Sequence, residues 1–302
     1  MLNGPEAAAP RFSVVILTYA RDPALARTLA RLADFTRDRD DLEVILVDNN
    51  LDAVDRQRML SAFPRHRVVK TGTNAGVSAR NDGMAVARGD YLVLLDDDVL
   101  VDTPDFLTRL AATFEARPDV GVVNIRKLDA ATMTQLPEAL PHTDKTVDPD
   151  TAFDTFRFIG GLVALRRSVF AQVGGFRPDF FYGSEERELS YRILKAGWRI
   201  RYDPEVVALE TNDAGGRRSR RDLRTETLIN TYIIAYLDKP LLPMLADIVL
   251  FTAFLWIRER GQVRVLHAWR RFAGWLGSSG RDRRAPISPA VQAYIRDCGG
   301  AT

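Results

Sequence analysis

The stretch RGDYLVLLDDD, residues 88–98, decides the predicted fold of this chain. It consists of a turn, a continuous apolar run from Tyr91 to Leu95, and three consecutive aspartates. A short apolar run without polar alternation is typical of a strand that is buried on both faces, as in a parallel sheet. The three aspartates therefore stand at the carboxyl end of a predicted buried strand.

Similar apolar runs, separated by helical patterns, lie on both sides of this stretch. We predict strands at Phe12–Thr18, Glu43–Val47, Arg67–Lys70, Tyr91–Leu95 and Val120–Ile125, and helices at Pro23–Ala33, Val54–Phe63, Ala75–Ala87 and Thr103–Phe114. Strands that alternate with helices predict a parallel α/β sheet with right-handed crossovers. Ligands of such sheets bind beyond the carboxyl ends of the strands, where Thr18-Tyr19, Asp48 and Asp96–Asp98 fall.

The pattern becomes less regular further along the chain. Asp129–Thr155 contains three prolines and several charges, which suits a loop over the site. Ser184–Ala196 is a predicted helix with Ser184 as its N-cap and glutamates in its first turn. Trp198–Tyr202 and Val206–Leu209 are predicted short strands on either side of Asp203-Pro204.

Composition limits the classes of function and of metal site. Of the 302 residues, 42 are basic and 40 are acidic, which excludes a strongly basic nucleic-acid-binding protein on bulk charge. The single cysteine, Cys298, excludes an internal disulfide and a cysteine-ligated zinc site. Three scattered histidines argue against a multi-histidine centre. A metal here is expected to be held by oxygen, which favours Mg²⁺ or Mn²⁺.

Two groups of polar residues near the predicted strand ends suggest a site for a divalent cation and a phosphate-containing ligand. The carboxylates of Asp96–Asp98 repel one another, and a divalent cation shared with a diphosphate would relieve that repulsion. The alternative is a solvated acidic turn. Arg80 carries fixed donors that suit phosphate or ribose oxygens. The alternative for this segment is a plain helix start, in which Asn74 caps the helix and Arg80 pairs with an acidic residue.

Taken together and in order, these motifs resemble those of the family-2 glycosyltransferases with the GT-A fold, over roughly Arg11–Asp213. The matching stretches are VVILTY (14–19), VDN (47–49), NAG (74–76), ARN (79–81), RGDY (88–91) leading to DDD (96–98), GGF (174–176) and SEEREL (184–189). The resemblance implies an α/β fold of GT-A type, a Rossmann-like, mostly parallel central sheet flanked by helices, followed here by a C-terminal helical extension.

The resemblance also implies roles for residues on the donor side. Thr18, Tyr19 and Asp48 would hold the nucleotide base and ribose, and Asp96 would meet the ribose or the sugar. Asp98 would bind the Mn²⁺ or Mg²⁺ that bridges the diphosphate. The full set of expected donor-binding residues is Thr18, Tyr19, Asp48, Asn74, Arg80, Asp96 and Asp97.

Glu185-Glu186 occupies the position of the family's Glu-Asp pair, so the resemblance implies that Glu186, assisted by Glu185, is the catalytic base. Glutamate at position 186 is one methylene longer than the usual aspartate. A second departure is the missing histidine after the last strand, where the sequence reads ALETND (208–213). Glu210 or Asp213 would replace it as an oxygen ligand, or the metal would rest on Asp98 and phosphate.

We therefore expect an inverting, metal-assisted glycosyltransferase of the EC 2.4 class. It would move one hexosyl or deoxyhexosyl unit from a nucleoside-diphosphate sugar, with UDP or dTDP favoured over GDP. The processive Gln-x-x-Arg-Trp signature is absent, which favours single transfer. The expected role is cell-surface polysaccharide or glycolipid biosynthesis. Two alternatives stay open, a nucleotidyltransferase of similar fold and a catalytically silent nucleotide-sugar-binding membrane scaffold.

The expected organisation is a lead-in over residues 1–10, a catalytic domain over 11–213 and a basic helical region over 214–302. Residues 215–302 carry 15 basic and 7 acidic side chains. This excess favours an anionic partner, although chance in an arginine-rich chain would also produce it. A cluster of arginines is expected to contact acceptor or phosphate groups: Arg217, Arg218, Arg220 and Arg221.

Leu241–Ile257 is mostly apolar but contains Pro243 and Asp247, which favours a core or interfacial helix over a membrane span. Over residues 258–275, arginines are interleaved with apolar residues that include Trp269 and Trp275, as in an amphipathic helix. This region would contact a membrane surface peripherally, or cover the catalytic domain, or form a homo-oligomer. The start of the chain shows no signal-peptide pattern, so a cytoplasmic location is expected, with peripheral binding to the inner face of the cell membrane.

Overall fold

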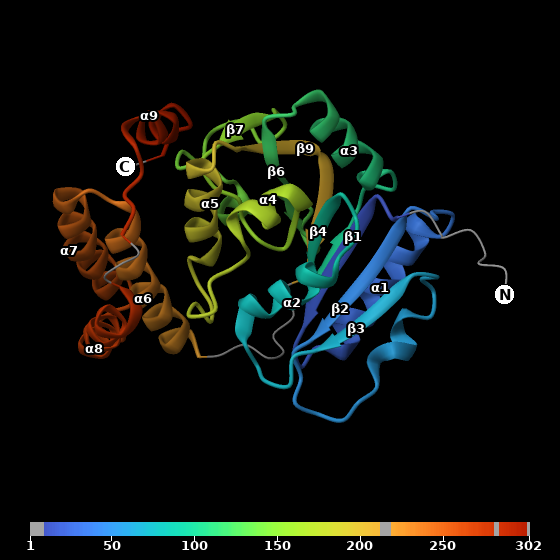
Figure 1. The fold of residues 1–302 in the computed structure, drawn as a ribbon, viewed down its shortest axis with the longest axis horizontal. Coiled ribbons are helices and arrows are strands. Elements are labelled where there is room, and N and C mark those ends of the chain that lie inside the picture. The colour runs from blue at the N-terminus through green and yellow to red at the C-terminus, as the bar shows by residue number, and fades with distance from the viewer. Residues whose placement is uncertain (1–8, 212–218, 281–283, 301–302) are drawn as a thin grey trace.

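The computed structural model describes residues 9–211, 219–280 and 284–300. Within them one nine-stranded sheet forms the centre of the molecule, with strand order β3-β2-β1-β4-β8-β6-β9-β5 and β7 paired to β9. Figure 1 shows helices on both faces of this sheet and the C-terminal helices gathered at one side. The strands are β1 Phe12–Thr18, β2 Leu42–Asp48, β3 His66–Lys70, β4 Tyr91–Asp96, β5 Val99–Val101, β6 Val120–Asp129, β7 Phe153–Thr155, β8 Leu162–Arg166 and β9 Arg199–Glu210.

The N-terminal half of the sheet is parallel, as the sequence predicts. β1 pairs in parallel with β2 and β4, and β2 pairs in parallel with β3. The register places Thr18 opposite Asp48 and Leu17 opposite Asp96. The polar residues that follow the apolar runs therefore meet at one edge of the sheet.

The other half of the sheet is mixed. β8 runs antiparallel between β4 and β6, while β6 and β9 are parallel. The prediction of two short strands around Asp203-Pro204 was wrong, since both belong to the single strand β9. Ile125 pairs with Asp203 and the next residue, Arg126, pairs with Val207. The proline thus lies in a bulge outside the ladder, where its missing N–H costs no hydrogen bond.

The helices are α1 Asp22–Thr36, α2 Arg80–Val86, α3 Phe106–Ala116, α4 Arg167–Val173, α5 Glu185–Lys195, α6 Arg220–Asp238, α7 Leu241–Arg258, α8 Val265–Trp275 and α9 Pro289–Asp297. Two predicted helices are shorter than expected. The first is only the 3₁₀ turn η1, Arg56–Leu60, and the second starts as the 3₁₀ turn η2, Gly76–Ala79, before it continues as α2. The predicted loop over 129–155 contains a further turn, η3 Pro137–Ala139, and the strand β7.

Each face of the sheet has its own hydrophobic cluster. Leu25 of α1 and Phe106 of α3 belong to the cluster on one face, and Leu189 of α5 belongs to the other. On that second face α2 packs closely because of Gly83, where an added Cβ would lie 2.6 Å from side-chain atoms of Val15 and of Val47. This close contact brings the start of α2 next to the strand ends.

The C-terminal helices share the second cluster. Leu228 and Tyr232 of α6 are fully buried in it together with residues of α5. The side-chain amide of Asn230 donates to the carbonyl oxygens of Tyr182 (3.1 Å) and Gly183 (2.7 Å) in the loop before α5. Helix α6 therefore contacts the segment that leads into Glu185-Glu186, and α7 packs on α6 (Figure 1).

Candidate active site

Two members of the aspartate triplet, Asp97 and Asp98, are buried and bound to a neighbouring arginine. Asp97 accepts a hydrogen bond from the Thr18 hydroxyl at 2.9 Å and, more weakly, from the Tyr19 N–H at 3.4 Å. The Arg21 guanidinium donates to Asp97 at 3.1 Å and to Asp98 at 2.8 Å. The structure thus brings the predicted β1 and β4 residues together. It adds Arg21, which sequence reasoning missed although it follows Thr18-Tyr19 at the same edge.

The burial of these carboxylates excludes the solvated acidic turn. Burial raises the pKa of Asp98 to about 6, the charges of Asp96, Asp97 and Glu210 add to the rise, and Arg21 opposes it. Burial likewise raises the pKa of Asp97. Carboxylates that are crowded and desolvated in this way fit a divalent cation with hard oxygen ligands.

Glu210 lies at the end of β9, close to Asp98. Its carboxylate pairs with the Lys127 ammonium at 3.1 Å, and the neighbouring Thr211 hydroxyl donates to the Asp98 carbonyl at 2.9 Å. Asp213 lies outside the described residues. Among the residues that the structure describes, no three His, Cys, Asp or Glu side chains are placed to hold a metal together. The donor set therefore fits a cation that takes its remaining ligands from a bound diphosphate.

Asp48 and Asn74 lie at the same edge and are tied into it by hydrogen bonds. The fully buried Asp48 accepts from the Asn50 side-chain amide at 2.9 Å and from the Arg56 guanidinium at 3.2 Å. The Asn74 side-chain oxygen accepts from the Asn49 amide at 2.9 Å. These bonds fix the loops beyond β2 and β3, where the nucleoside is expected.

Arg80 is buried at the start of α2 and forms an ion pair with Asp96. The alternative prediction of an acidic partner for Arg80 is therefore confirmed. Its Nε atom is buried and has no hydrogen-bond partner in the described part of the chain. The charges of Arg80 and Asp96 both act on the pKa of Glu186 at the start of α5.

Glu185 and Glu186 begin α5, directly after Ser184. Ser184 is the N-cap as predicted, but it has a left-handed backbone (φ 67°) and makes no side-chain capping bond. Glu186 accepts from the Gly160 N–H at 3.3 Å. The other carboxylate, that of Glu185, is buried, and one of its oxygens has no partner among the described residues.

Both glutamates hold protons more tightly than an exposed glutamate. Burial raises the pKa of Glu185 to about 8, with a further contribution from the charge of Glu186. Burial also raises the pKa of Glu186, Arg80 opposes that rise, and Asp96 adds to it. A raised pKa suits a carboxylate that accepts a proton near neutral pH.

A strand-end site with buried aspartates, an arginine and a raised-pKa glutamate is what the sequence resemblance implied. The model of glycosyl transferase family 2 matches residues 13–174, more than half of the 302 residues. The chain belongs to glycosyl transferase family 2. A second model, described as the N-terminal domain of galactosyltransferase, matches residues 143–210 of this family 2 enzyme.

Several known proteins are similar to this chain in sequence or in fold. N-acetylglucosaminyl-diphospho-decaprenol L-rhamnosyltransferase from Mycobacterium tuberculosis H37Rv is 29% identical over 65% of this chain and 74% of its own length. An uncharacterized protein, y4gI, from Sinorhizobium fredii is 28% identical over 62% of this chain, which spans only 20% of that protein. The solved structure of mannosyltransferase PcManGT from Pyrobaculum calidifontis, in complex with GDP-Man and Mn²⁺, has a TM-score of 0.59 and 22% identity, covering 96% of this chain and 79% of that one. The family 2 chain is thus an enzyme of the EC 2.4 class with the GT-A fold.

The predicted basic cluster of this glycosyltransferase is only partly described. Arg217 and Arg218 lie outside the described residues. Arg220 forms an ion pair of 2.9 Å with Glu259, the residue that follows α7, so its charge is already neutralised by an acidic side chain. Arg221 is exposed at the start of α6. Anion binding by this cluster stays a prediction.

Proposed function

We propose that this family 2 glycosyltransferase transfers a single sugar from a nucleoside-diphosphate sugar to an acceptor hydroxyl, with metal assistance and inversion. The observation that carries the proposal is the meeting of Asp98, the Arg80–Asp96 pair and Glu186 at one sheet edge. This arrangement offers a cation site for the donor and a base for the acceptor at the same edge of the sheet.

Donor binding would use the strand ends. The loops fixed by Asp48 and Asn74 would receive the nucleoside, and Asp98 would hold Mn²⁺ or Mg²⁺ together with diphosphate oxygens. When bound, such a metal neutralises the charge that develops on the departing nucleoside diphosphate. The Mn²⁺ and GDP-Man bound in PcManGT support this assignment. From the sequence we favour UDP or dTDP as the nucleotide here.

Glu186 would act on the acceptor. Its carboxylate takes the proton from the acceptor hydroxyl as that oxygen bonds to the anomeric carbon. The bond between the anomeric carbon and the diphosphate breaks on the opposite face, and the electron pair leaves with the nucleoside diphosphate. A single in-line displacement of this kind inverts the configuration.

A lipid-linked saccharide is the acceptor class we propose, in cell-surface polysaccharide or glycolipid biosynthesis. The name of the Mycobacterium tuberculosis relative describes an acceptor built on a diphospho-polyprenol. The exposed apolar helices described below would place such an acceptor near the enzyme.

A donor screen tests the proposal. Incubation with UDP-, dTDP- and GDP-sugars is expected to release the matching nucleoside diphosphate, at a rate that rises at least about tenfold when Mn²⁺ is added, because the metal stabilises the leaving group. Chromatography of the nucleotide products measures this. Pyrophosphate release would identify the alternative nucleotidyltransferase. No turnover with any donor, with or without Mn²⁺, would favour the silent binding protein.

We further propose that α7 and α8 rest on an anionic membrane surface. Among the described residues, α7 is a helix long and apolar enough to cross a membrane, and only 17% of its residues are buried. It packs on α6 through Met244, Ile248 and Leu255, and its Asp247 pairs with Lys239 at 2.5 Å. A helix that packs on α6 through one side and is exposed on the other suits a surface position better than a span.

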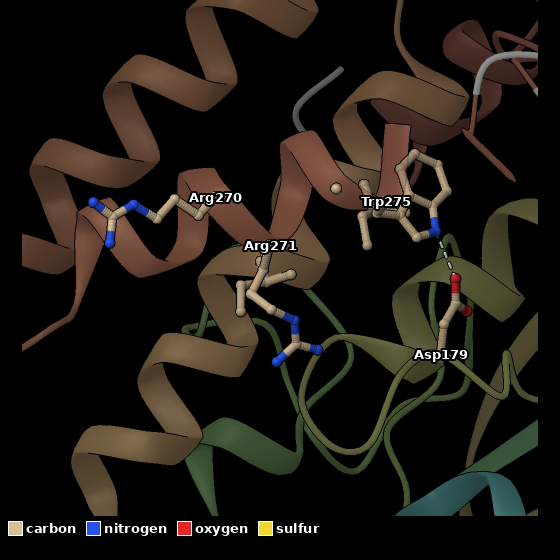
Figure 2. A pocket seen from close by; sticks show the side chains of 7 residues that line it. Asp179, Arg270, Arg271 and Trp275 are labelled. Atoms are coloured by element: carbon tan, nitrogen blue, oxygen red, sulfur yellow. Dashed lines mark hydrogen bonds between the residues drawn. The ribbon is translucent and has the colours of Figure 1, made fainter. Parts of the chain in front are cut away.

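The exposed face is apolar with arginines beside it. A groove of about 440 Å³ between α7 and α8 is lined by Ile248, Val249, Thr252, Ala253, Trp256, Val265 and Trp269. Arg258 and Arg260 follow the apolar stripe and are exposed. Figure 2 shows a separate pocket beside α8, where Arg270 and Arg271 point in different directions and Trp275 donates to Asp179. This hydrogen bond, 2.7 Å long, fixes α8 to the loop before α5. Apolar side chains next to arginines suit anionic headgroups.

Vesicle flotation tests this surface. Wild-type protein is expected to float with phosphatidylglycerol vesicles and much less with phosphatidylcholine vesicles. The triple variant L242E/V249E/L250E should lose most of the binding, since it places three charges on the exposed face. The variant L51E/V54E/M133E changes three other exposed apolar residues and should bind like wild type. Wild type remaining unbound, or forming a dimer that the α7 variant dissolves, would refute the membrane proposal.

A further inference from the structure

Two arginines beside Glu186 form no ion pair with any residue that the structure describes. Arg157 donates no side-chain hydrogen bond within the described part of the chain, and its guanidinium lies 5.5 Å from the Phe156 ring centre. Arg187 donates one, to the Thr231 hydroxyl of α6 at 3.0 Å. The Nε atoms of both are buried and unpaired among the described residues. Other arginines of this site differ, because Arg21 and Arg80 pair with aspartates.

Arg187 is near enough to Arg157 for its charge to act on it. Burial lowers the pKa of Arg157, and the positive charge of Arg187 lowers it further, while Tyr191 and Glu186 oppose the change. Lys145 adds a third cation, because its pKa is lowered by burial and then by the charge of Arg157. Like charges that are partly withdrawn from water are unfavourable unless an anion joins them.

The backbone around these residues holds them at the base. Phe158 donates its N–H to the Ser190 hydroxyl of α5 at 3.3 Å, and Ile159 donates to the Asn124 side chain at 2.6 Å. The next N–H, that of Gly160, contacts Glu186. Arg187 is the residue after Glu186. Both arginines therefore stand within a few residues of the carboxylate that would meet the acceptor.

We infer that Arg157 and Arg187 bind a phosphate or diphosphate group of the acceptor, on the Glu186 side of the site. The inference rests on the proposed function, which places the acceptor hydroxyl at Glu186. The donor diphosphate would lie at the aspartate triplet, whose arginines are already paired. Two guanidinium groups offer paired N–H donors that match phosphate oxygens. The group would belong to a lipid-linked or a soluble phosphorylated acceptor.

Binding of inorganic phosphate in EDTA tests the site without any metal at the aspartate triplet. Calorimetry with wild-type protein is expected to show saturable binding. R157Q and R187Q should each weaken it about tenfold or more, because a charge-assisted hydrogen bond contributes about 1.5–3 kcal/mol. R67Q, at an exposed position on β3, removes the same charge and should stay within about twofold of wild type. No saturable binding, or equal binding by R157Q and R67Q, would overturn the inference.

Two further measurements separate the outcomes. Donor binding in Mn²⁺ is expected to survive in R157Q, and an equal loss of donor binding and phosphate binding would assign the arginines to the donor and overturn the inference. Absence of hydrolysis in wild type would count against the proposed function, while phosphate binding would still report on this site. Vesicles with phosphatidic acid, compared with phosphate in solution, distinguish the sources. Binding in solution that depends on Arg157, with a larger dependence on vesicles, indicates a lipid phosphate, and equal dependence in both indicates a soluble one.

Discussion

Replacing Glu186 with glutamine is expected to lower kcat about 10³-fold, since positioned general bases contribute about 10² to 10⁴. Glutamine preserves the size of the side chain and can still accept the Gly160 hydrogen bond through its amide oxygen. It cannot take the proton of the acceptor hydroxyl. The proposed donor site is built on Asp98 and the loops beyond β2 and β3, so the Kd for the donor should change less than about twofold.

Two further readouts make this prediction specific to a base. E186D retains a carboxylate that is one methylene shorter, and an intermediate loss of about tenfold is expected. In wild type kcat/KM should rise with pH on the acid side, because the deprotonated glutamate is the active form. Burial raises the pKa of Glu186, so the rise should lie above the ordinary glutamate value of 4.5. E186Q with near wild-type kcat would disprove the assignment.

Asp98→Asn is expected to weaken donor binding in Mn²⁺ by about a hundredfold and to abolish the effect of the metal. Asparagine keeps the shape of the side chain and still accepts from Arg21, but it lacks the charge that attracts a divalent cation. Loss of about 3 kcal/mol of metal-mediated attraction corresponds to this factor. Calorimetric titration with the preferred nucleotide sugar, with Mn²⁺ and in EDTA, measures it.

The matched control is Asp90→Asn, a charge removal at an exposed turn before β4, where the side chain is 72% exposed. It should leave donor affinity within about twofold of wild type. Thermal unfolding of both variants shows whether either change disturbs the fold. If D98N binds donor as wild type does, and still responds to Mn²⁺, Asp98 is not a metal ligand.

The strand ends could be predicted because each buried strand of a parallel sheet is a short apolar run, and the polar residue that stops it marks the edge. Asp48 and Asp96 carry that signal in their immediate neighbours. The direction of β8 carries no such signal, since its pairing partners lie in β4 and β6, far away in sequence. The bulge at Asp203-Pro204 likewise depends on how β9 pairs with β6. In the sequence alone, the same proline indicates the end of one strand and the start of another.

The arginines show a second limit. Sequence reasoning selected Arg220 because it stands in a run of arginines, yet in the structure Glu259 neutralises it. Arg157 and Arg187 stand alone in the sequence, and their lack of acidic partners becomes visible only when segments about 30 residues apart are brought together. The apolar pattern of α7 predicts a helix, but which side of it packs on α6 depends on tertiary contacts.

The Asn230 contact has a consequence for how such enzymes diversify. Its amide holds the two carbonyls before Ser184, and a Cβ at Gly183 would come within 2.5 Å of the Thr227 hydroxyl. The turn before Glu186, the proposed base, is therefore held by α6, the helix on which α7 packs. If two relatives exchanged the chain beyond β9, the turn before Glu186 from one enzyme would pack on the α6 of the other. Lineages that change the C-terminal helices are expected to change positions 183, 227 and 230 together.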